Sequence, residues 1–294
     1  MKILVLGCNG QLGRCLNDQL EKTDHKVIYT SRDHINIADF SVAKSQIRGI
    51  SPDVVINATA YTAVDMAEEE QEKADLINNK AVANVASICG ELDCWLIHVS
   101  TDYVFDGLSA VPYLENDKVN PQGVYGATKL KGELAIQASG CKYLIIRTAW
   151  VFSEYGSNFL KTMLRLGAER DEISIVGDQI GCPTYGQDLA NGIINIIPFL
   201  QEKETVSGVY HYGGDHPCSW YEFALAIFLE AKKMGLKTPQ LVHSIGSSAY
   251  PTRAVRPFYS VLDCRKINDF FGVNTSDWGF GVKDVIGKLQ TGKP

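Results

Sequence analysis

The sequence lacks any long apolar run, and this absence argues against a membrane protein. No stretch reaches the ~18 consecutive apolar residues that a membrane-spanning helix requires. The longest candidate, 193–200, is interrupted by Asn195 and Pro198. The opening run Ile3–Leu6 is too short for the apolar region of a signal peptide. We therefore expect a cytoplasmic protein with no membrane partner.

Closely spaced cysteine pairs and an excess of basic residues are also missing. The eight cysteines are scattered and none forms a C-x-x-C pair, so neither a disulfide framework nor a structural zinc site is expected. The chain has 28 Lys and Arg against 34 Asp and Glu, a formal net charge of −6. Nucleic acid is therefore excluded as an expected main partner.

What the chain does have is enough length and apolar content for a large core. It has 294 residues, of which 45% are hydrophobic, and a chain of this size folds without disulfide or metal staples. The first 150 residues alternate short apolar runs with helical patterns. Such alternation favours a Rossmann-type doubly wound parallel sheet. Strands are predicted at 3–6, 26–30, 54–56, 95–99 and 143–147, and helices at 12–20, 39–47, 73–89 and 125–139.

Beyond residue 150 the alternation loosens, and we predict a smaller mixed α/β substrate domain over 151–294. No linker separates it cleanly from the NAD(P)-binding domain over 1–150, so some late segments are expected to return to the first domain. Helices are predicted at 159–166, 187–197 and 220–233, a strand at 209–212, and loops at 244–257 and 272–281.

Three glycines predict a dinucleotide site. Gly7, Gly10 and Gly13 form G-x-x-G-x-x-G directly after the first predicted strand and into the first predicted helix. Small residues there let the backbone approach a pyrophosphate, and the helix N-terminus offers free N–H groups to that anion. The alternative is that these glycines serve packing alone.

The end of the second predicted strand bears on the choice of cofactor. An acidic residue at this place binds the ribose 2′-hydroxyl of NAD, whereas an arginine suits the 2′-phosphate of NADP. The chain has Ser31 and Arg32 here, with Asp33 just beyond. We therefore predict NADPH, with NADH possible as the second choice. In the alternative, Arg32 faces solvent, paired with Asp33.

A tyrosine and a lysine four residues apart predict the proton chemistry. Tyr125 and Lys129 lie on one face of a predicted helix, and a lysine ammonium near a phenol lowers the pKa of the phenol. Ser100 and Thr101 follow a predicted strand, at the sheet edge where ligands bind. A hydroxyl there can bond the carbonyl that the tyrosine protonates.

Several longer blocks, in order and over nearly the whole length, resemble the extended short-chain dehydrogenase/reductase family. The two most specific are Ser100–Gly107 (S-T-D-Y-V-F-D-G) and Arg147–Phe152 (R-T-A-W-V-F). The others are Gly7–Gly13, Asn57–Asp65, Val124–Lys129, Asn158–Phe159, Gly177–Thr184 and Arg256–Pro257.

The resemblance implies an activity and a set of site residues. The activity is reduction of the C4 keto group of dTDP-4-dehydro-β-L-rhamnose to dTDP-L-rhamnose, with hydride from NAD(P)H and the proton from Tyr125. Lys129 would bind the nicotinamide ribose, and Thr101 would orient the keto group. The other cofactor contacts implied are Gly10, Gln11 and Leu12 at the pyrophosphate, Asp39 and Phe40 at the adenine, and Ala60, Tyr61 and Thr62 at the middle of the cofactor.

Contacts to the sugar nucleotide are expected from Asp102 and Trp150, although a tryptophan packed in the core is an equal alternative for Trp150. Arg253 and Arg256 are candidates for the substrate diphosphate, with a surface role as the alternative.

Four further features receive structural interpretations. We predict that Asp65 caps a helix, with support of catalysis as the alternative. We also predict that 68–70 (Glu-Glu-Glu) is a solvated helix face rather than a metal site, and that His98 is structural. Cys182 lies in a predicted active-site loop, without a base to activate it.

One departure from the family pattern concerns metal. Some members hold a magnesium ion with glutamates at a dimer interface, but this chain has Cys15 and Gln187 at the aligned positions. Neither is the anionic oxygen ligand that magnesium prefers. We predict no metal requirement, and either a monomer or a metal-independent homodimer.

Two other functions remain open at this point. The chain could reduce a different nucleotide-linked 4-keto-6-deoxy sugar, because a few side chains decide sugar stereochemistry. It could also be a non-catalytic NADP-binding regulatory subunit. The presence of Tyr125, Lys129 and Thr101 together disfavours this last alternative.

Overall fold

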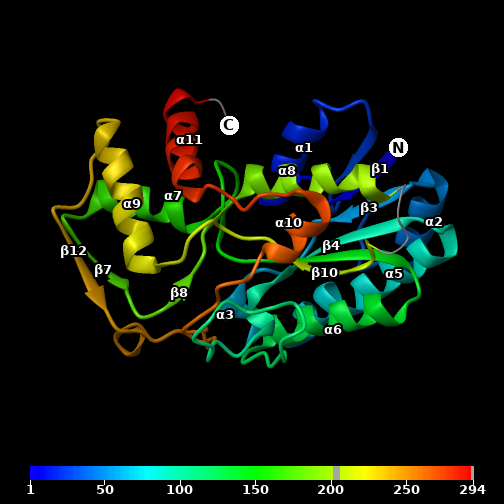
Figure 1. Cartoon of the computed structure of the whole chain (residues 1–294), viewed down its shortest axis with the longest axis horizontal. Helices are drawn as coiled ribbons and strands as arrows, with labels where there is room; N and C mark the ends of the chain where they lie inside the picture. Colours follow the sequence, from blue (N-terminus) through cyan, green and yellow to red (C-terminus); the bar gives the residue numbers. More distant parts are fainter. Residues whose placement is uncertain (201–205, 293–294) are drawn as a thin grey trace.

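A six-stranded parallel sheet forms the centre of the molecule. The computed structural model describes residues 1–200 and 206–292, and the strand order in the sheet is β10-β5-β4-β3-β1-β2 (Figure 1). The strands are β1 (Lys2–Leu6), β2 (Lys26–Thr30), β3 (Val54–Asn57), β4 (Trp95–Thr101), β5 (Lys142–Thr148) and β10 (Gly208–His211). This architecture confirms the predicted Rossmann-type fold.

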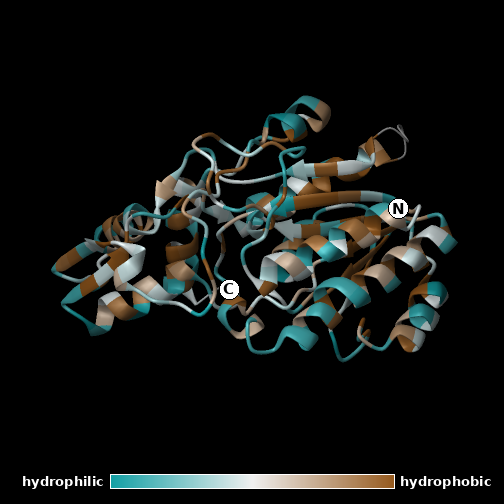
Figure 2. Ribbon diagram, turned by 90° about the horizontal axis from the view of Figure 1, so that it is seen from below, coloured by the Kyte–Doolittle hydropathy of each residue, from teal (hydrophilic) through white to brown (hydrophobic). Residues whose placement is uncertain are grey.

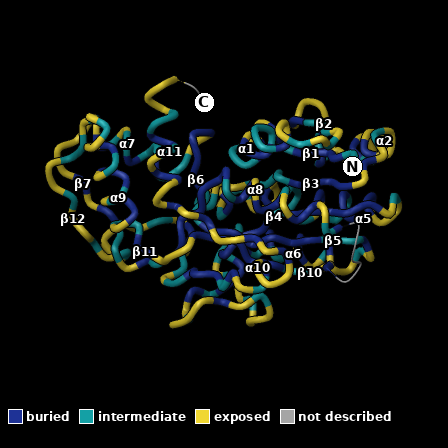
Figure 3. Tube along the Cα trace, turned by 45° about the horizontal axis from the view of Figure 1, so that its top comes forward, coloured by how far each residue is buried: buried dark blue, intermediate teal, exposed yellow. Residues whose placement is uncertain are grey.

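Helices cover both faces of the sheet because alternate side chains of each strand point to opposite faces. Ile3 and Val5 of β1 join one core with α1 and α8, whereas Leu4 and Leu6 join the other with α2, α5 and α6. The four inner strands, β5, β4, β3 and β1, are accordingly buried on both sides and read as near-continuous apolar runs, whereas the edge strand β2 is mostly half-buried (Figures 2 and 3). These helices span Gln11–Leu20 (α1), Phe40–Ile50 (α2), Ala81–Leu92 (α5), Val124–Ala138 (α6) and Gly186–Ile196 (α8).

Two of these elements come from beyond residue 150. Strand β10 pairs with β5 as the edge of the sheet, and α8 packs along α1. The sheet is therefore completed by residues far along the chain.

The remaining elements form a lobe at the other end of the molecule (Figure 1), with its own apolar core. Helices α7 (Phe159–Glu169), α9 (Trp220–Lys233) and α11 (Trp278–Thr291) pack there beside the parallel pair β7 (Glu172–Val176) and β12 (Leu241–Ile245). Four short strands connect the lobe to the sheet: β6 (Val151–Phe152), β8 (Ile180–Gly181), β9 (Thr184–Tyr185) and β11 (Cys218–Ser219). Helix α10 (Arg265–Phe271) lies beside β10.

Two loop predictions are partly wrong. Strand β12 extends into the predicted loop 244–257, where a short helical turn, Ser247–Ala249, also forms. Helix α11 begins inside the predicted loop 272–281, because Asp277 caps it by accepting from Phe280 N at 2.8 Å. In the described part of the chain, no helix has the length and apolar character needed to cross a membrane.

The helix predicted over 73–89 is interrupted in a specific way. It comprises α4 (Gln71–Asp75), a π-helical turn (Leu76–Lys80) and α5. The π turn contains the buried Asn78. Such turns are frequent at functional sites, and this one carries an amide into the centre of the molecule.

Candidate active site

The glycine turn between β1 and α1 has the geometry of an anion cradle. Gly7 N and Cys8 N donate to Thr30 O at 2.9 and 3.0 Å. Helix α1 begins after Gly10, and among the described residues no side chain caps it. A Cβ added to Gly13 would lie 2.1 Å from Gly7 O, so only glycine fits this approach. The uncapped N–H groups and the open backbone fit a pyrophosphate.

Substitution of Gly13 tests this cradle. We expect Gly13→Ala to weaken NADPH binding by ~10-fold or more. The added methyl group can fit only if the glycine turn moves, and such overpacking costs about 1–3 kcal/mol. The matched control is Gly49→Ala in α2, where an added Cβ meets nothing within 4 Å. Titration of cofactor fluorescence measures both; equal affinities for the two variants would contradict the assignment.

Gln11 links the cradle to the second half of the chain. Its Nε2 donates to Val151 O at 3.0 Å, and its Oε1 accepts from Asn158 Nδ2 at 2.7 Å. Asn158 in turn caps α7. The neighbouring Leu12 is half-buried against the core. The first turn of α1 is therefore fixed to the segment that begins the distal lobe.

The residues predicted to select and hold the adenosine half lie after β2. Ser31 is buried and contacts His34 Nδ1 at 2.9 Å, whereas Arg32 is exposed. Among the described residues, Arg32 and Asp33 do not form an ion pair with each other. Asp39 caps α2 by accepting from Val42 N at 3.2 Å, and Phe40 is 39% exposed.

The segment after β3 is held by an asparagine that the sequence analysis did not single out. Asn78 accepts from Tyr61 N at 2.8 Å, and its Nδ2 donates to Tyr61 O at 3.1 Å and to Thr128 Oγ1 at 3.2 Å. Ala60 and Thr62 flank this anchor. An amide on the apolar face of the predicted helix, between Ala74 and Ala81, was the available signal.

The acidic run 68–70 does not form a simple solvated face, so that prediction is wrong for two of its three residues. Glu68 Oε1 accepts from Val124 N at 2.8 Å, at the start of α6. Glu70 accepts from the Tyr61 hydroxyl at 2.8 Å. Glu68 thus fixes the backbone next to the predicted catalytic tyrosine, whereas Glu70 holds the side chain of Tyr61.

The structure brings Thr101 and Tyr125 together at the carboxyl end of β4. The two hydroxyls share a hydrogen bond, which opposes the rise in the phenol pKa. That pKa lies above its ordinary value, first because of burial and second because of the charge of Asp102. The tyrosine ring also packs edge-on against Tyr103, with centroids 5.5 Å apart. The predicted lowering of this pKa by Lys129 is therefore not what the structure shows.

Two buried polar atoms beside this pair have no partner among the described residues. They are Oδ2 of Asp102 and Oγ1 of Thr148, at the ends of β4 and β5. Burial raises the pKa of Asp102 to about 6, although hydrogen bonds from Ser260 and Thr101 oppose the rise. Unpartnered polar atoms at the carboxyl edge of a parallel sheet are suited to a polar ligand. Thr148 was not among the predicted site residues.

Lys129 lies one turn after Tyr125 and is almost fully buried. Its Nζ contacts His98 Nε2 at 3.0 Å and Val99 O at 2.7 Å, both on β4. Burial lowers its pKa to about 8, and the charge of Glu133 opposes that shift. His98, interpreted from the sequence as structural, is therefore in direct contact with a predicted catalytic residue.

A buried ion pair supports this face of α6. Arg147 of β5 binds Glu133 through Nε and Nη2, with Nη2 to Oε2 at 2.7 Å. Ser100 Oγ also donates to Glu133, at 2.5 Å. The two charged side chains are only 4% and 0% exposed.

Trp150 packs against another tryptophan. Its ring stacks on Trp220 with centroids 3.4 Å apart and 7° between the planes. A Cβ added to Gly181 would lie 2.6 Å from the same indole. The ring is half-buried in an aromatic cluster, so packing accounts for at least one of its faces.

The two candidate arginines both pair with carboxylates near α3 (Val64–Ala67). Arg256 Nη2 contacts Asp65 Oδ2 at 2.8 Å, and Arg253 Nη1 contacts Glu69 Oε1 at 2.8 Å. Asp65 does not cap the helix as predicted, because Ala63 precedes its first turn. Instead Asp65 accepts from Ala254 N and Arg256, and so fastens the 253–256 segment beside the site.

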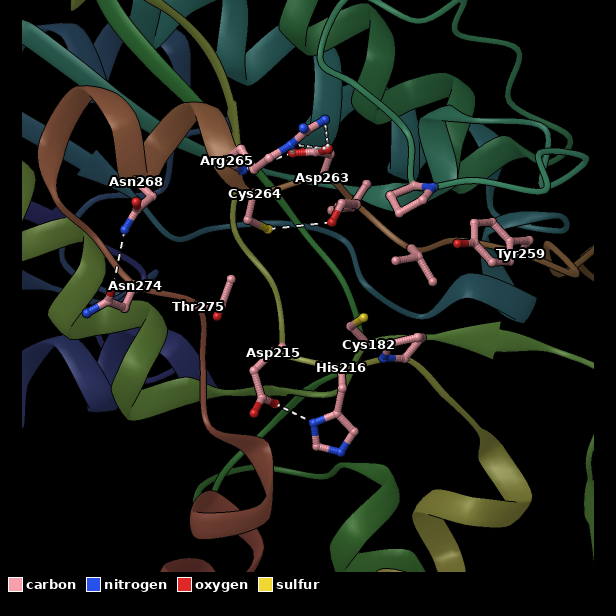
Figure 4. Close-up of a pocket in the computed structure, with 15 residues that line it drawn as sticks. Cys182, Asp215, His216, Tyr259, Asp263, Cys264, Arg265, Asn268, Asn274 and Thr275 are labelled. Atoms are coloured by element: carbon pink, nitrogen blue, oxygen red, sulfur yellow. Dashed lines mark hydrogen bonds and ion pairs between the residues drawn. The ribbon is translucent and has the colours of Figure 1, made fainter.

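A pocket of about 410 Å³ lies beside α10 (Figure 4), and its lining does not include Thr101, Tyr125 or Lys129. Cys182 lines it, together with the ion-paired Asp215 and His216. Burial and the charges of Asp215 and Asp102 raise the pKa of Cys182 to about 12. That thiol is therefore protonated at neutral pH, in line with the absence of an activating base from the sequence pattern.

Cys15 and Gln187, the positions noted above for lacking an anionic oxygen ligand, border a mixed polar network. Gln187 Nε2 donates to Asp18 Oδ2 at 2.7 Å and to Glu154 Oε1 at 3.1 Å. The ammonium of Lys288 contacts Glu154 Oε1 at 2.7 Å. Burial raises the pKa of Cys15 to about 12. Over residues 1–200 and 206–292, no group of three or more His, Cys, Asp or Glu could hold a metal ion.

Comparison with known proteins gives a consistent picture. The family model for the RmlD substrate binding domain matches residues 1–291. A dTDP-4-dehydrorhamnose reductase of Escherichia coli K12 is 40% identical over 296 residues, covering 99% of both chains. The crystal structure of a dTDP-4-dehydrorhamnose reductase from Clostridium acetobutylicum superposes with a TM-score of 0.91 at 38% identity, covering 99% of this chain and all of that one. A third relative, from Bacillus anthracis, was solved in complex with NADP (TM-score 0.88, 34% identity, 98% and 99% coverage).

Proposed function

The chain belongs to the RmlD substrate binding domain family, and from this membership we propose that it reduces dTDP-4-dehydro-β-L-rhamnose to dTDP-L-rhamnose with NADPH. Relatives that align over nearly their whole length are dTDP-4-dehydrorhamnose reductases, and one related structure holds NADP. The observation in this chain that carries the proposal is the contact between Thr101 and Tyr125 at the sheet edge, with Lys129 one helical turn away.

The chemistry divides between the cofactor and the protein. When bound, NADPH supplies the hydride. Tyr125 donates a proton to the C4 oxygen, since its phenol carries that proton at neutral pH. Thr101 hydrogen bonds the same oxygen and orients it. Lys129 holds the nicotinamide ribose beside them.

Substrate contacts are assigned to the residues that surround this pair. The unpartnered carboxylate oxygen of Asp102 accepts a sugar hydroxyl, and the exposed part of Trp150 packs on the sugar nucleotide. Arg256, 28% exposed and already beside the site, is better placed for the diphosphate than Arg253, which is 58% exposed. A guanidinium suits a diphosphate because of its planar array of donors.

The test is the oxidation of NADPH by the purified protein with dTDP-4-dehydro-L-rhamnose made in situ, with NADH and EDTA in parallel reactions. Rapid oxidation that survives EDTA supports both the reductase and its independence of metal. Oxidation of NADPH only with another nucleotide-linked 4-keto sugar would show that this other sugar is the substrate. Binding of NADPH without any oxidation would favour the regulatory subunit.

The choice of cofactor can be tested separately. We expect Arg32→Ala to raise the KM for NADPH by ~10-fold, because a charge-assisted bond to the 2′-phosphate is worth about 1.5–3 kcal/mol. The KM for NADH should stay within twofold, since NADH has no such phosphate. Steady-state kinetics with both cofactors measure this. Equal increases in the two KM values would show that Arg32 does not bind the 2′-phosphate.

The cellular setting follows from the same proposal. A biosynthetic reductase that uses NADPH works in the cytoplasm, and the eight cysteines are all unpaired and buried, as suits a reducing compartment. We propose a monomer or a homodimer that needs no metal. Size-exclusion chromatography with light scattering, with and without EDTA, tests this assembly state.

A further inference from the structure

A chain of buried polar groups runs beneath the catalytic pair and ends at the glycine turn. Lys129 Nζ contacts His98 Nε2 at 3.0 Å, and His98 Nδ1 contacts Asn57 Nδ2 at 3.1 Å. Asn57 Oδ1 accepts from Thr59 N at 3.1 Å and from Thr59 Oγ1 at 2.5 Å. His98 and Asn57 are fully buried, and Thr59 packs against Gly7.

The donors and acceptors in this series of hydrogen bonds fix which nitrogen of the His98 imidazole carries the proton. Because Oδ1 of Asn57 accepts from the Thr59 backbone, the amide NH₂ of Asn57 faces His98 Nδ1. An NH₂ group can only donate there, so Nδ1 carries the lone pair. A neutral imidazole has one N–H, which must then lie on Nε2, facing the Lys129 nitrogen.

Lys129 must accept that N–H, and an ammonium cannot accept a hydrogen bond. The hydrogen-bond pattern is therefore complete only when Lys129 is an uncharged amine that accepts from His98 and donates to Val99 O. Burial lowers the pKa of Lys129 to about 8, which agrees with this argument in direction and makes the amine the main form above that pH. Burial and the nearby lysine also hold the pKa of His98 well below its usual range.

Few other ionisable groups surround the pair. From α6, Glu133 favours the charged lysine, but it already binds Arg147 of β5 and Ser100 of β4. Tyr125 lies one turn earlier on the same helix. His98 is thus the group on β4 that opposes the charge of Lys129.

We propose that His98 is a positioning residue that holds Lys129 against β4 and favours its uncharged amine, so that at alkaline pH the lysine gains a proton when cofactor binds. This inference rests on the proposed NADPH-dependent reduction. The phosphates and ribose hydroxyls of NADPH favour an ammonium, so above about pH 8 binding takes up a proton from solvent. Cofactor affinity then falls as pH rises through the pKa of Lys129.

The direct test uses the protein without cofactor and does not depend on activity. In protein labelled with ¹³C at lysine Cε, the Lys129 signal, assigned through Lys129→Met, should titrate about two pH units below the other lysines. In histidine-labelled protein, ¹⁵N shifts should show the Nε2–H tautomer of His98. An Nδ1–H tautomer, or a Lys129 signal that titrates with the surface lysines, would overturn the proposal.

Variants then separate positioning from mere packing. His98→Gln offers a carbonyl oxygen to an ammonium, and His98→Phe removes the N–H with similar bulk. In His98→Gln the Lys129 titration should move up by about one pH unit or more, because an acceptor favours the ammonium. In His98→Phe it should stay low, because the site remains buried and gains no acceptor. The control is His211→Gln, because His211 is an equally buried histidine on β10 whose Nδ1 contacts Tyr113 O. An unchanged Lys129 titration in His98→Gln would overturn the proposal, and the wild-type tautomer decides if that variant does not fold.

Cofactor binding supplies the second readout. Between pH 7 and 9.5 the Kd for NADPH should rise ~10-fold in the wild type, and in His98→Gln the rise should begin about one pH unit higher. NADH serves as a control for ionisation of the 2′-phosphate. If the lysine titrates as expected but the protein oxidises NADPH with no keto sugar, the proposed function fails while the charge assignment stands. A Kd independent of pH in the wild type would overturn the proton uptake.

Discussion

Replacement of Tyr125 by phenylalanine is expected to lower kcat by ~10²–10⁴-fold, the usual contribution of a positioned general acid. The ring is retained, so its edge-on contact with Tyr103 and the folded state should persist. The Kd for NADPH should change by less than about twofold, because the phenol acts on the substrate oxygen. Stopped-flow NADPH oxidation and fluorescence titration measure the two quantities.

The matched control for this substitution is Tyr143→Phe. Tyr143 lies on β5, half-buried and away from the sheet edge where Thr101 and Tyr125 meet, so its hydroxyl has no expected part in the reaction. Full turnover in Tyr125→Phe, or an equal loss in Tyr143→Phe, would show that the proton comes from another group.

The second large effect is on stability. Glu133→Gln should lower the free energy of unfolding by about 3–5 kcal/mol, because it leaves Arg147 charged and only 4% exposed without its partner. Ser100 also loses a charged acceptor. Urea denaturation followed by circular dichroism gives the midpoint, which should fall without a change in slope.

An exposed ion pair provides the comparison. Arg165 and Glu169 are 60% and 54% exposed at i,i+4 spacing on α7, so Glu169→Gln should cost less than about 1 kcal/mol. The double variant Glu133→Leu with Arg147→Leu should recover much of the loss, since it removes both buried charges. Equal midpoints for Glu133→Gln and Glu169→Gln would contradict this account.

The inner strands of the sheet could be predicted from the sequence because they are buried on both faces. Runs such as Ile3–Leu6 and 54–56 are continuously apolar and bounded by turns, so their position is determined locally. Strand β12 could not be recognised in this way. Its residues Leu241–Ile245 are mostly exposed, and only pairing with β7, over 60 residues earlier, makes it a strand.

The candidate site likewise combines features that local sequence patterns reveal with features that depend on contacts between distant residues. The glycine turn and the tyrosine–lysine spacing are local patterns, and the structure keeps both in the expected strand–turn–helix context. Asp65, Glu68 and Asn78 act through partners 50 to 190 residues away, and spacing along the chain carries no record of such contacts. His98 was interpreted as structural because a histidine on a strand is usually packed; its proximity to Lys129 depends on how α6 crosses β4.

The late arrival of β10 has a consequence for biosynthesis. During translation the first five strands leave the ribosome before Gly208–His211 exist, so the nascent chain presents the open edge of β5 and an apolar sheet face that α8 covers only later. An unpaired edge beside uncovered apolar surface is a site for aggregation. The central sheet therefore cannot be completed until residue 211 has emerged, and until then β5 can pair with a strand of another chain.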